Sequence, residues 1–425
     1  MERAEASGVG LRISFGKRSF WIGFLLLMLI SLPVAGSEGA VKEEVSTPVI
    51  VMLLPMSGDL APVGRQLMES ATLAGSDLGL RVESLDEGDS PGETLRALDE
   101  LAGRDDIVAV IGPLGRRRAP MAARKATEMG LPLVVYSPQG GVERLGDRVF
   151  RARPDAQEQS RTVATYLVER EGIRTLGILS PRTEYGREFT AAMVEAFSRA
   201  GGQVRAYSSY GADTTDFRPA LEVLVGKRAW VGRGRQIDGR SSDRFGTIPL
   251  PREGEIGFEA LVILDFHDRV ARILPFLPGV GIQTGAGGEG TGVQLVGLSG
   301  WRGDGLHHAG MHALGAVFFD TFGGETEGGQ AEEFFHRFQE QFRRSPTTAE
   351  AEIYDLVGMI GSGIRARQPG ESWADAALAR LREPTAYPGV TGSWSFDEEG
   401  APVRYLRGYR VIEGGRWVPL GGVAP

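Results

Sequence analysis

The sequence predicts an α/β protein built from two doubly wound units. From Pro48 onward, short apolar runs alternate with amphipathic stretches of helical period, and the alternation restarts after residue 154. Such regularity implies parallel sheets with helices on both faces. The chain has 425 residues, which favours two units because single cores stop growing at about 250–300 residues.

The first unit begins with an apolar run between two prolines. Val49–Leu54 contains no polar residue, which predicts a strand buried on both faces. A capping signature, Ser90 to Glu93 with Pro at the first helical position, opens a helix. The other predicted strands span 80–85, 107–111 and 131–136, and the other predicted helices span 64–78 and 118–129.

The second unit repeats the pattern over residues 155–299. A second capping signature, Asp155 to Glu158, opens its first helix. Its predicted strands span 175–179, 204–210, 260–264 and 293–297, with helices over 187–200, 216–225 and 268–277. Beyond it the sequence predicts a strand over 316–319, helices over 332–344, 349–364 and 373–381, and an antiparallel tail over 390–418.

Two stretches are longer than ordinary connections, residues 226–257 and 279–292. The first is a charged insertion loop with seven basic and four acidic residues. Two interpretations of it stay open, a functional loop and a solvated insertion.

The N-terminus predicts export. A basic pair at residues 17–18 precedes an apolar run from Phe20 to Val34, and small residues follow. The run is shorter than the roughly 20 residues that cross a bilayer. We therefore expect residues 1–36 to be a signal peptide cleaved after Gly36, with a cut three residues later or retention as an anchor as alternatives. The protein is expected to be periplasmic and to meet the membrane only through an uncleaved leader.

Composition excludes several kinds of function. The chain has no cysteine, which excludes disulfides, thiolate metal sites, thiol nucleophiles and the lipid-bearing cysteine of a bacterial lipoprotein. A formal net charge of −8 argues against nucleic acid as a partner. No nucleophile elbow, Walker loop or dinucleotide fingerprint follows a predicted strand. The sequence therefore predicts no catalytic residue, no cofactor and no enzyme.

Three histidines raise the hypothesis of a metal site. His308 and His312 are spaced i, i+4 on a predicted helix, and His307 is adjacent. No Glu lies within the motif and no further ligand is evident, so the pattern does not match a zinc protease. We predict no metal ligand.

Ligands of doubly wound sheets bind beyond the carboxyl ends of the strands. The loops that follow the predicted strands are short and polar, and most of them contain glycine. They supply nine candidate ligand-binding residues: Ser57, Gly115, Arg116, Ser137, Gln139, Tyr185, Asp265, Ser299 and Trp301.

The most conspicuous element in these loops is the run Arg116, Arg117 and Arg118 at a predicted helix N-terminus. Backbone N–H groups and the helix dipole favour an anion there. The run either meets an acidic ligand or partner, or is a solvated helix start. Tyr185 and Trp301 likewise have two interpretations, ligand contact and packing.

The order of these elements resembles the type I periplasmic solute-binding proteins of the leucine-binding kind. The resemblance covers about residues 48–420 and is carried by loop and strand-end segments. These are 54–58 with Gly64, 110–113, 130–133, 149–151, 184–186, 201–202, 215–217, 389–392 and 396–397 with Gly400.

The resemblance implies a clamshell of two lobes joined by a three-strand hinge, with a small-molecule ligand in the cleft between them. Lobe I would comprise residues 48–154 plus 300–385, and lobe II residues 155–299 plus 386–425. It also implies that Tyr185 contacts ligand and that the loops at 115–116 and 137–139 hold a carboxylate. The implied function is the solute-binding component of an ABC-type transporter, for an amino-acid-like or anionic molecule.

The chain departs from that family at two positions. Arginines follow Gly112-Pro113 where amino-acid binders usually carry hydroxyls, and Ser299 stands in the loop that supplies their acidic partner for an ammonium group. Asp265 remains as the candidate carboxylate. A simple neutral amino acid therefore fits the pattern poorly.

A second hypothesis comes from a sub-branch. Residues 258–265, the charged insertion and residues 297–301 are similar to the ligand-binding-like domain of penicillin-binding-protein activators. That similarity implies a periplasmic regulator of peptidoglycan synthesis that contacts a cell-wall synthase. The lipid-bearing cysteine of those activators is absent. An exported enzyme is a third hypothesis, but no motif supports it.

Overall fold

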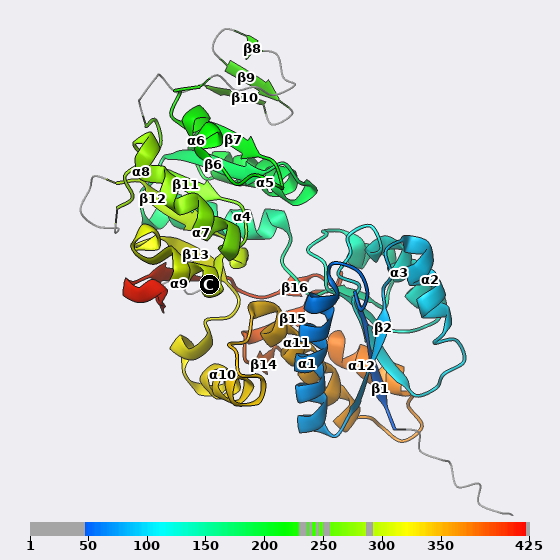
Figure 1. Ribbon diagram of the computed structural model, residues 1–425. Helices are drawn as coiled ribbons and strands as arrows, with labels where there is room; N and C mark the ends of the chain where they lie inside the picture. Colours follow the sequence, from blue (N-terminus) through cyan, green and yellow to red (C-terminus); the bar gives the residue numbers. More distant parts are fainter. Residues whose placement is uncertain are drawn as a thin grey trace, which may run out of the picture. The chain divides into compact units, whose positions relative to one another are not determined.

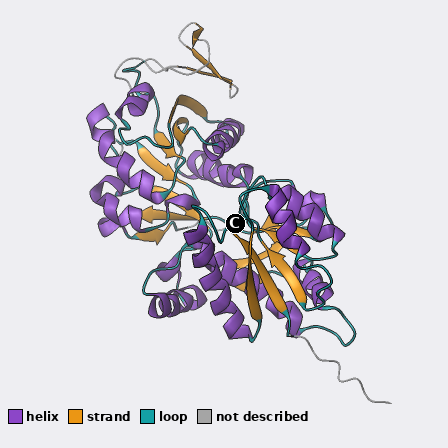
Figure 2. Ribbon diagram, turned by 45° about the vertical axis from the view of Figure 1, so that its right-hand side comes forward, coloured by secondary structure: helices purple, strands orange, loops and turns teal. Residues whose placement is uncertain are grey.

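The computed structural model describes residues 47–228, 236–237, 240–243, 246–249, 256–285 and 292–421. The predicted signal peptide lies outside these residues. Two parallel sheets with helices on both faces dominate the described chain (Figures 1 and 2). None of the helices in this part of the chain has the length and apolar character needed to span a bilayer.

The first sheet has five parallel strands in the order β2-β1-β3-β4-β5. Its strands are β1 (Val49–Leu54), β2 (Arg81–Asp86), β3 (Ile107–Ile111), β4 (Leu133–Val135) and β5 (Val149–Arg151). The pairing of Val49 with both Arg81 and Ile107 places β1 in the interior of the sheet. Every residue of β1 and β3 is buried, as the uninterrupted apolar runs predict.

Two groups of helices cover this sheet. On one face α2 (Pro91–Asp99) and α3 (Ala119–Glu128) bury Leu98 and Ala122. On the other face α1 (Ala61–Leu78) packs with α11 (Thr348–Arg365) and α12 (Trp373–Leu381). The predicted cap of α2 is confirmed, because Ser90 Oγ accepts from the Glu93 N–H and the Glu93 carboxylate accepts from the Ser90 N–H.

The second sheet has seven strands in the order β18-β17-β13-β12-β11-β6-β7. They are β6 (Thr175–Pro181), β7 (Gln203–Tyr210), β11 (Ala260–Ile263), β12 (Gln294–Gly297), β13 (Val317–Asp320), β17 (Arg407–Val411) and β18 (Trp417–Pro419). The first five are parallel, and β17 and β18 are antiparallel additions at one edge. The five parallel strands agree with their predicted ranges within two residues at each end, and β17 and β18 correspond to the end of the predicted antiparallel tail.

Helices again cover both faces of the second sheet. One face carries α4 (Ala156–Thr165) and α5 (Glu184–Arg199), and the other carries α6 (Arg218–Leu224), α7 (His267–Ile273), α8 (Leu277–Val280) and α9 (Asp304–Ala309). The Asp155 cap of α4 is confirmed, with Asp155 Oδ1 accepting from the Glu158 N–H at 2.9 Å.

The lobe boundaries differ from the sequence prediction at two places. Val296 pairs with Val317, so β13 belongs to the second sheet, whereas residues 300–385 were all expected in lobe I. The antiparallel strands β14 (Tyr387–Gly389), β15 (Gly392–Phe396) and β16 (Pro402–Val403) were expected in lobe II. Instead Trp394 and Phe396 pack into the core of the first sheet.

The chain therefore passes between the two sheets three times. We call residues 152–155, 321–328 and 404–406 the crossover segments. They follow β5, β13 and β16 respectively. Helix α10 (Gly329–Phe342) comes directly after the second of them.

The charged insertion at 226–257 is not described in full. Its described part contains β8 (Gln236–Ile237), β9 (Arg240–Asp243) and β10 (Gly246–Pro249). These pair as an antiparallel sheet in the order β10-β9-β8 (Figure 1). The described part of the charged insertion loop therefore contains short strands, which the sequence analysis did not predict.

Candidate functional site

Tyr185 is held rigidly at the carboxyl end of β6. It lies in the first turn of α5, where the Thr183 hydroxyl accepts from the Gly186 N–H at 3.1 Å. A Cβ on Gly186 would lie 2.0 Å from the carbonyl oxygen of Pro181. Only glycine permits this close approach, which fixes the turn that carries Tyr185.

Aromatic side chains from two strand ends pack against one another at this point. The Tyr185 ring centroid lies 4.4 Å from that of Phe189 and 5.4 Å from that of Phe266, which follows β11. A Cβ on Gly300 would come within 2.9 Å of the Phe266 ring. The loops after β6, β11 and β12 therefore meet, as the sequence predicts for a ligand site.

Charged groups from three segments act on Tyr185. Burial raises the pKa of its phenol well above the ordinary value, the carboxylates of Asp265 and Glu188 raise it further, and Arg153 opposes them. The hydroxyl therefore stays protonated and is available as a donor. Arg153 lies in the first crossover segment, so one group of this site comes from between the two sheets.

Arg153 and Tyr136 were not among the predicted site residues. The Arg153 guanidinium carbon lies 5.5 Å from the centre of the Tyr136 ring. We call Tyr136, Arg153, Tyr185 and Phe266 the Tyr185 cluster. Tyr136 ends the fourth predicted strand, and Arg153 follows the segment 149–151 that carries part of the family resemblance. Their place at or just beyond the end of a strand was the only feature of the sequence that could have indicated either residue.

A buried carboxylate links the cluster to the crossover segments. Oε1 of Glu352 accepts from Thr321 Oγ1 at 2.7 Å and lies 3.2 Å from Arg404 Nη1. Oε2 accepts from the Tyr136 hydroxyl and lies 3.4 Å from Arg153 Nε. Each of the three crossover segments thus contributes one of these partners.

The ionised form of Glu352 is favoured despite its burial. Burial alone would raise its pKa, but Arg404 and Arg153 outweigh that effect and lower the pKa. Glu352 therefore keeps its negative charge between two guanidinium groups.

The arginine run does not form an open anion site. Arg118 Nη1 donates to Glu87 Oε1 at 2.8 Å, and Glu87 Oε2 accepts from the Leu114 N–H at 2.7 Å. Glu87 is fully buried. A carboxylate of the chain itself thus accepts from the N–H groups before α3.

The other two arginines of the run differ from each other. Arg116 forms an ion pair with Glu188 of α5. Arg117 is exposed. The alternative interpretation, a solvated helix start, describes Arg117 alone.

Asp265 is already saturated. Its Oδ2 accepts from the Tyr210 hydroxyl at 2.5 Å and lies 3.7 Å from Arg269 Nε. Its Oδ1 accepts from the Phe266 N–H at 2.8 Å. Asp265 therefore shapes the loop that carries Phe266 and is not positioned as a free ligand contact.

Hydroxyl and amide groups from lobe I and lobe II complete the predicted set. Ser137 Oγ and Gln139 Oε1 are buried and make no hydrogen bond with the described residues. Ser299 Oγ donates to Gln159 Oε1 at 3.5 Å. Unsatisfied buried oxygens at a strand end are typical of a place where water or a ligand completes the hydrogen bonding.

Ser57 and Gly115 lie in loops of lobe I. Ser57 is exposed. Burial raises the pKa of Asp86, but hydrogen bonds from the Ser57 side chain and the Gly88 and Met56 N–H groups outweigh it, so the pKa is lowered. The Gly115 N–H points to Glu87 Oε2 at 3.4 Å.

Trp301 belongs to the core. It is fully buried, its Nε1 donates to the Ile263 carbonyl at 2.9 Å, and it packs with the apolar residues of the second lobe. A Cβ on Gly297 would lie 2.1 Å from the indole. The packing interpretation of Trp301 therefore fits its position in the core, and its role as a ligand contact stays a prediction.

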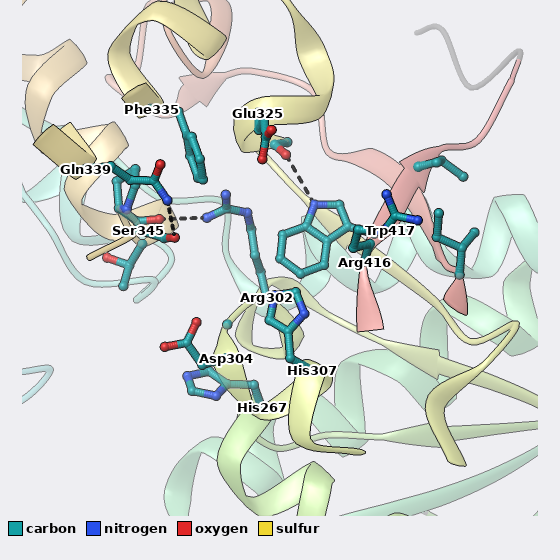
Figure 3. Close-up of a pocket in the computed structure, with 16 residues that line it drawn as sticks. His267, Arg302, Asp304, His307, Glu325, Phe335, Gln339, Ser345, Arg416 and Trp417 are labelled. Carbon is teal, nitrogen blue, oxygen red and sulfur yellow. Dashed lines mark hydrogen bonds between the residues drawn. The ribbon is translucent and has the colours of Figure 1, made fainter. Parts of the chain in front are cut away.

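A separate cavity of about 590 Å³ lies beside the second crossover segment (Figure 3). Arg302 enters it and donates from Nη1 to the Pro346 carbonyl at 3.0 Å. Its guanidinium lies 4.4 Å from the Phe322 ring centre and 5.4 Å from that of Trp417. The cavity is thus crossed by an arginine held between aromatic rings.

The histidines considered for metal binding do not converge. His307 lines this cavity and its Nδ1 lies 3.1 Å from the Gly414 carbonyl oxygen. Helix α9 ends at Ala309, so the expected single helix carrying His308 and His312 is interrupted. Within the described ranges no group of three or more potential metal ligands is found.

Comparisons with known proteins agree with this architecture. A family model described as periplasmic binding protein matches residues 47–231. No curated protein matches the chain.

Similar solved structures include an ABC transporter substrate-binding protein from Sphaerobacter thermophilus, with 19% identity, a TM-score of 0.70, and coverage of 88% of this chain and 96% of that one. A solute binding protein of an ABC transporter from Rhodopseudomonas palustris BisB5, in complex with 3,4-dihydroxy benzoic acid, gives 18% identity, a TM-score of 0.67, and 88% and 96% coverage. The branched-chain amino acid transporter substrate binding protein LivJ from Streptococcus pneumoniae, in complex with isoleucine, gives 20% identity, a TM-score of 0.64, and 88% and 99% coverage.

At these identities the similarity establishes the fold. The sequence match over residues 47–231 and the two-sheet topology together confirm the resemblance, and the protein has the type I periplasmic-binding fold.

Proposed function

We propose that this protein is a non-catalytic, extracytoplasmic solute-binding protein that delivers a small molecule to a membrane transporter of the ABC type. The observation that carries the proposal is the convergence of strand-end loops on Tyr185, where the charge of Arg153 also acts on the phenol. The structural relatives support it, because they are named as transporter substrate-binding proteins. The basic and apolar N-terminal segment supports export.

The ligand would be held by the Tyr185 cluster together with polar groups of the neighbouring loops. The proposed contacts among the predicted residues are Ser57, Gly115, Arg116, Ser137, Gln139, Tyr185 and Ser299. Asp265 and Trp301 would act indirectly, because one orients the loop of Phe266 and the other packs against Gly297 at the start of the loop that carries Ser299. No step of bond making or breaking is part of this function.

Closure would use the crossover segments as the hinge. Tyr136 and Arg153 both contact Glu352, and Glu352 contacts Thr321 and Arg404. A ligand that contacts the Tyr185 cluster would therefore be linked, through Glu352, to all three crossover segments. Hinge closure around a ligand is a common motion of two-lobed binding proteins.

The alternative function, regulation of peptidoglycan synthesis through a synthase, depends only on the sequence similarity of residues 258–265, the charged insertion and residues 297–301. It predicts a protein partner and no small-molecule ligand. The experiment below separates the two functions.

Thermal melting of the purified protein against a panel of amino acids, aromatic carboxylates, dicarboxylates and muropeptides tests the proposal. A ligand that binds only the folded state raises the midpoint by mass action. We expect at least one solute to do so, and Tyr185→Ala to remove the shift. Met311→Ala, an exposed apolar residue outside the cluster, should keep it. A flat panel for the unaltered protein would reject solute binding.

A further inference from the structure

We infer that the Tyr185 cluster binds a small organic anion that carries no ammonium group, with Arg153 as the anion-binding residue and Glu352 as its positioning residue. This inference rests on the proposed solute-binding function. It names the ligand class of that site, and it differs from the zwitterionic ligand of an amino-acid binder.

The first argument is the set of donors that Arg153 keeps available. Its Nε lies 3.4 Å from Glu352, and its side-chain nitrogens make no hydrogen bond to any residue that the structure describes. The side chain is 26% exposed. A guanidinium has five N–H donors in a planar fork that matches a carboxylate. Arg153 can therefore take a carboxylate without breaking an existing hydrogen bond.

The second argument is that three other arginines near these loops are already engaged. Arg118 pairs with Glu87, and Arg116 pairs with Glu188. Arg404 contacts Glu352 and donates to Thr391 Oγ1 at 2.6 Å. An anion that approached any of these would have to displace a carboxylate or hydroxyl of the protein itself.

The third argument concerns the ammonium group. Asp265 is the only candidate carboxylate that the sequence analysis offered for a ligand ammonium group. It is buried, and its oxygens already contact Tyr210, Arg269 and the Phe266 N–H. Glu188 is paired with Arg116. An ammonium group placed beside the cluster would lose its water without gaining a free carboxylate, which is costly for a charged group.

The fourth argument concerns the part of the ligand that does not carry the charge. Phe266 is 50% exposed, so part of its ring is accessible to a ligand. Its centroid is 5.4 Å from that of Tyr185, which is too close for a further ring between them, since two stacking contacts need about 7 Å. A flat or apolar body would therefore pack on the outer face of Phe266, with its carboxylate toward Arg153.

Glu352 would act through Arg153. It is buried, and Thr321, Arg404 and Tyr136 fix both of its oxygens. A fixed carboxylate orients the guanidinium and stabilises its charge. Removing that charge should weaken anion binding only as long as Arg153 is present.

Isothermal titration of the full chain with benzoate, leucine and benzylamine tests this inference. Benzoate supplies the anion and a flat ring, leucine supplies a zwitterion, and benzylamine supplies the ring with a cation. We expect measurable binding of benzoate, with leucine and benzylamine at least about tenfold weaker. Arg153→Gln should weaken benzoate binding about 10- to 150-fold, the range for a lost charged hydrogen bond. Arg117→Gln, at the exposed arginine of the same run, is the matched control and should change it less than threefold.

A double-mutant cycle separates positioning from a general structural effect. Glu352→Gln should weaken benzoate binding about tenfold in the unaltered chain and less than twofold in the Arg153→Lys background. Equal weakening in both backgrounds would overturn the role of Glu352. Circular dichroism of each variant verifies that it is folded.

The remaining outcomes distinguish an error in the inferred ligand class from an error in the proposed solute-binding function. Leucine binding without benzoate binding, or benzoate binding that is insensitive to Arg153→Gln, would overturn the ligand class and leave solute binding intact. Failure of all three probes, with only an amino acid or a muropeptide of the panel raising the melting midpoint, would do the same, whereas a shift with a dicarboxylate or another aromatic carboxylate would support the ligand class. Failure of the probes and of the whole panel would reject the solute-binding function as well.

Discussion

Arg118 Nη1 lies 2.8 Å from Oε1 of Glu87, a carboxylate with no exposed surface. Because of this ion pair, Arg118 of the run Arg116, Arg117 and Arg118 binds a carboxylate of the protein itself. The Glu87 carboxylate also accepts from the N–H groups of Leu114 and Gly115. The donors at the start of α3 are thus used to join two strand-end loops of lobe I.

The first prediction concerns that pair. Arg118→Gln should lower the free energy of unfolding by about 3–5 kcal/mol, because it leaves a buried carboxylate without its cation. Arg116→Gln is the matched control. It breaks a partly exposed pair with Glu188 and should cost about 0–1 kcal/mol. Urea unfolding of both variants measures the difference, and equal costs would contradict this account.

The second prediction concerns pH. Burial raises the pKa of Asp320 to about 7, Arg302 opposes it, and Thr348 donates to Asp320 Oδ2 at 2.5 Å. The folded protein therefore holds a proton on Asp320 at a pH where the unfolded chain has lost it. This contribution to stability is complete below about pH 4 and is lost as the pH rises to about 7.

Asp320→Asn removes that contribution while keeping the shape of the side chain. The stability of the unaltered protein relative to this variant should fall between pH 4 and pH 7, by at most about 4 kcal/mol. Urea midpoints at several pH values measure it. Parallel pH profiles for the two proteins would show that Asp320 does not titrate in this window.

The third prediction separates core from ligand site. Trp301→Phe removes the hydrogen bond to the Ile263 carbonyl and part of a fully buried ring. We expect a loss of about 2–4 kcal/mol in unfolding free energy and a change of less than about threefold, or 0.7 kcal/mol, in ligand affinity of the folded protein. Tyr185→Phe, which keeps the ring, should have the smaller effect on stability. If the Trp301→Phe variant were folded but no longer bound ligand, Trp301 would be a ligand contact after all.

The fourth prediction concerns specificity. Tyr210→Phe removes the hydroxyl that donates to Asp265, so the carboxylate loses one of its partners. Stability should fall by about 1–3 kcal/mol, and the preference for benzoate over leucine should narrow, because Asp265 gains capacity to meet an ammonium group. Titration of both solutes checks this. An unchanged ratio of affinities would show that Asp265 does not face the ligand.

Local patterns in the sequence were sufficient for the fold class and for most elements, although the three-residue strand β5 was not predicted. Uninterrupted apolar runs such as Val49–Leu54 and Ile107–Ile111 form strands buried on both faces. The capping signatures at Ser90 and Asp155 form the expected reciprocal hydrogen bonds. These features depend on neighbours within a few residues, which the sequence displays directly.

The lobe assignment was only partly predictable. The pattern of β13 shows that the strand is buried but not which sheet it joins, and its pairing with β12 and β17 places it in lobe II. The same holds for β15, whose Trp394 and Phe396 pack in lobe I. An apolar pattern indicates that a strand is buried, but it does not indicate which of the two cores buries it.

The sequence by itself determined a two-unit α/β chain with candidate site residues at its strand ends, since periodicity and caps are local properties. Tertiary structure alone decided which candidates are available to a ligand. It paired Arg116 with Glu188 and Arg118 with Glu87, and it placed the Arg153 guanidinium over the Tyr136 ring with its Nε free of hydrogen bonds to the described residues. The physical reason is that a charge's role depends on which opposite charge lies within a few ångströms, and these partners are separated by many residues along the chain.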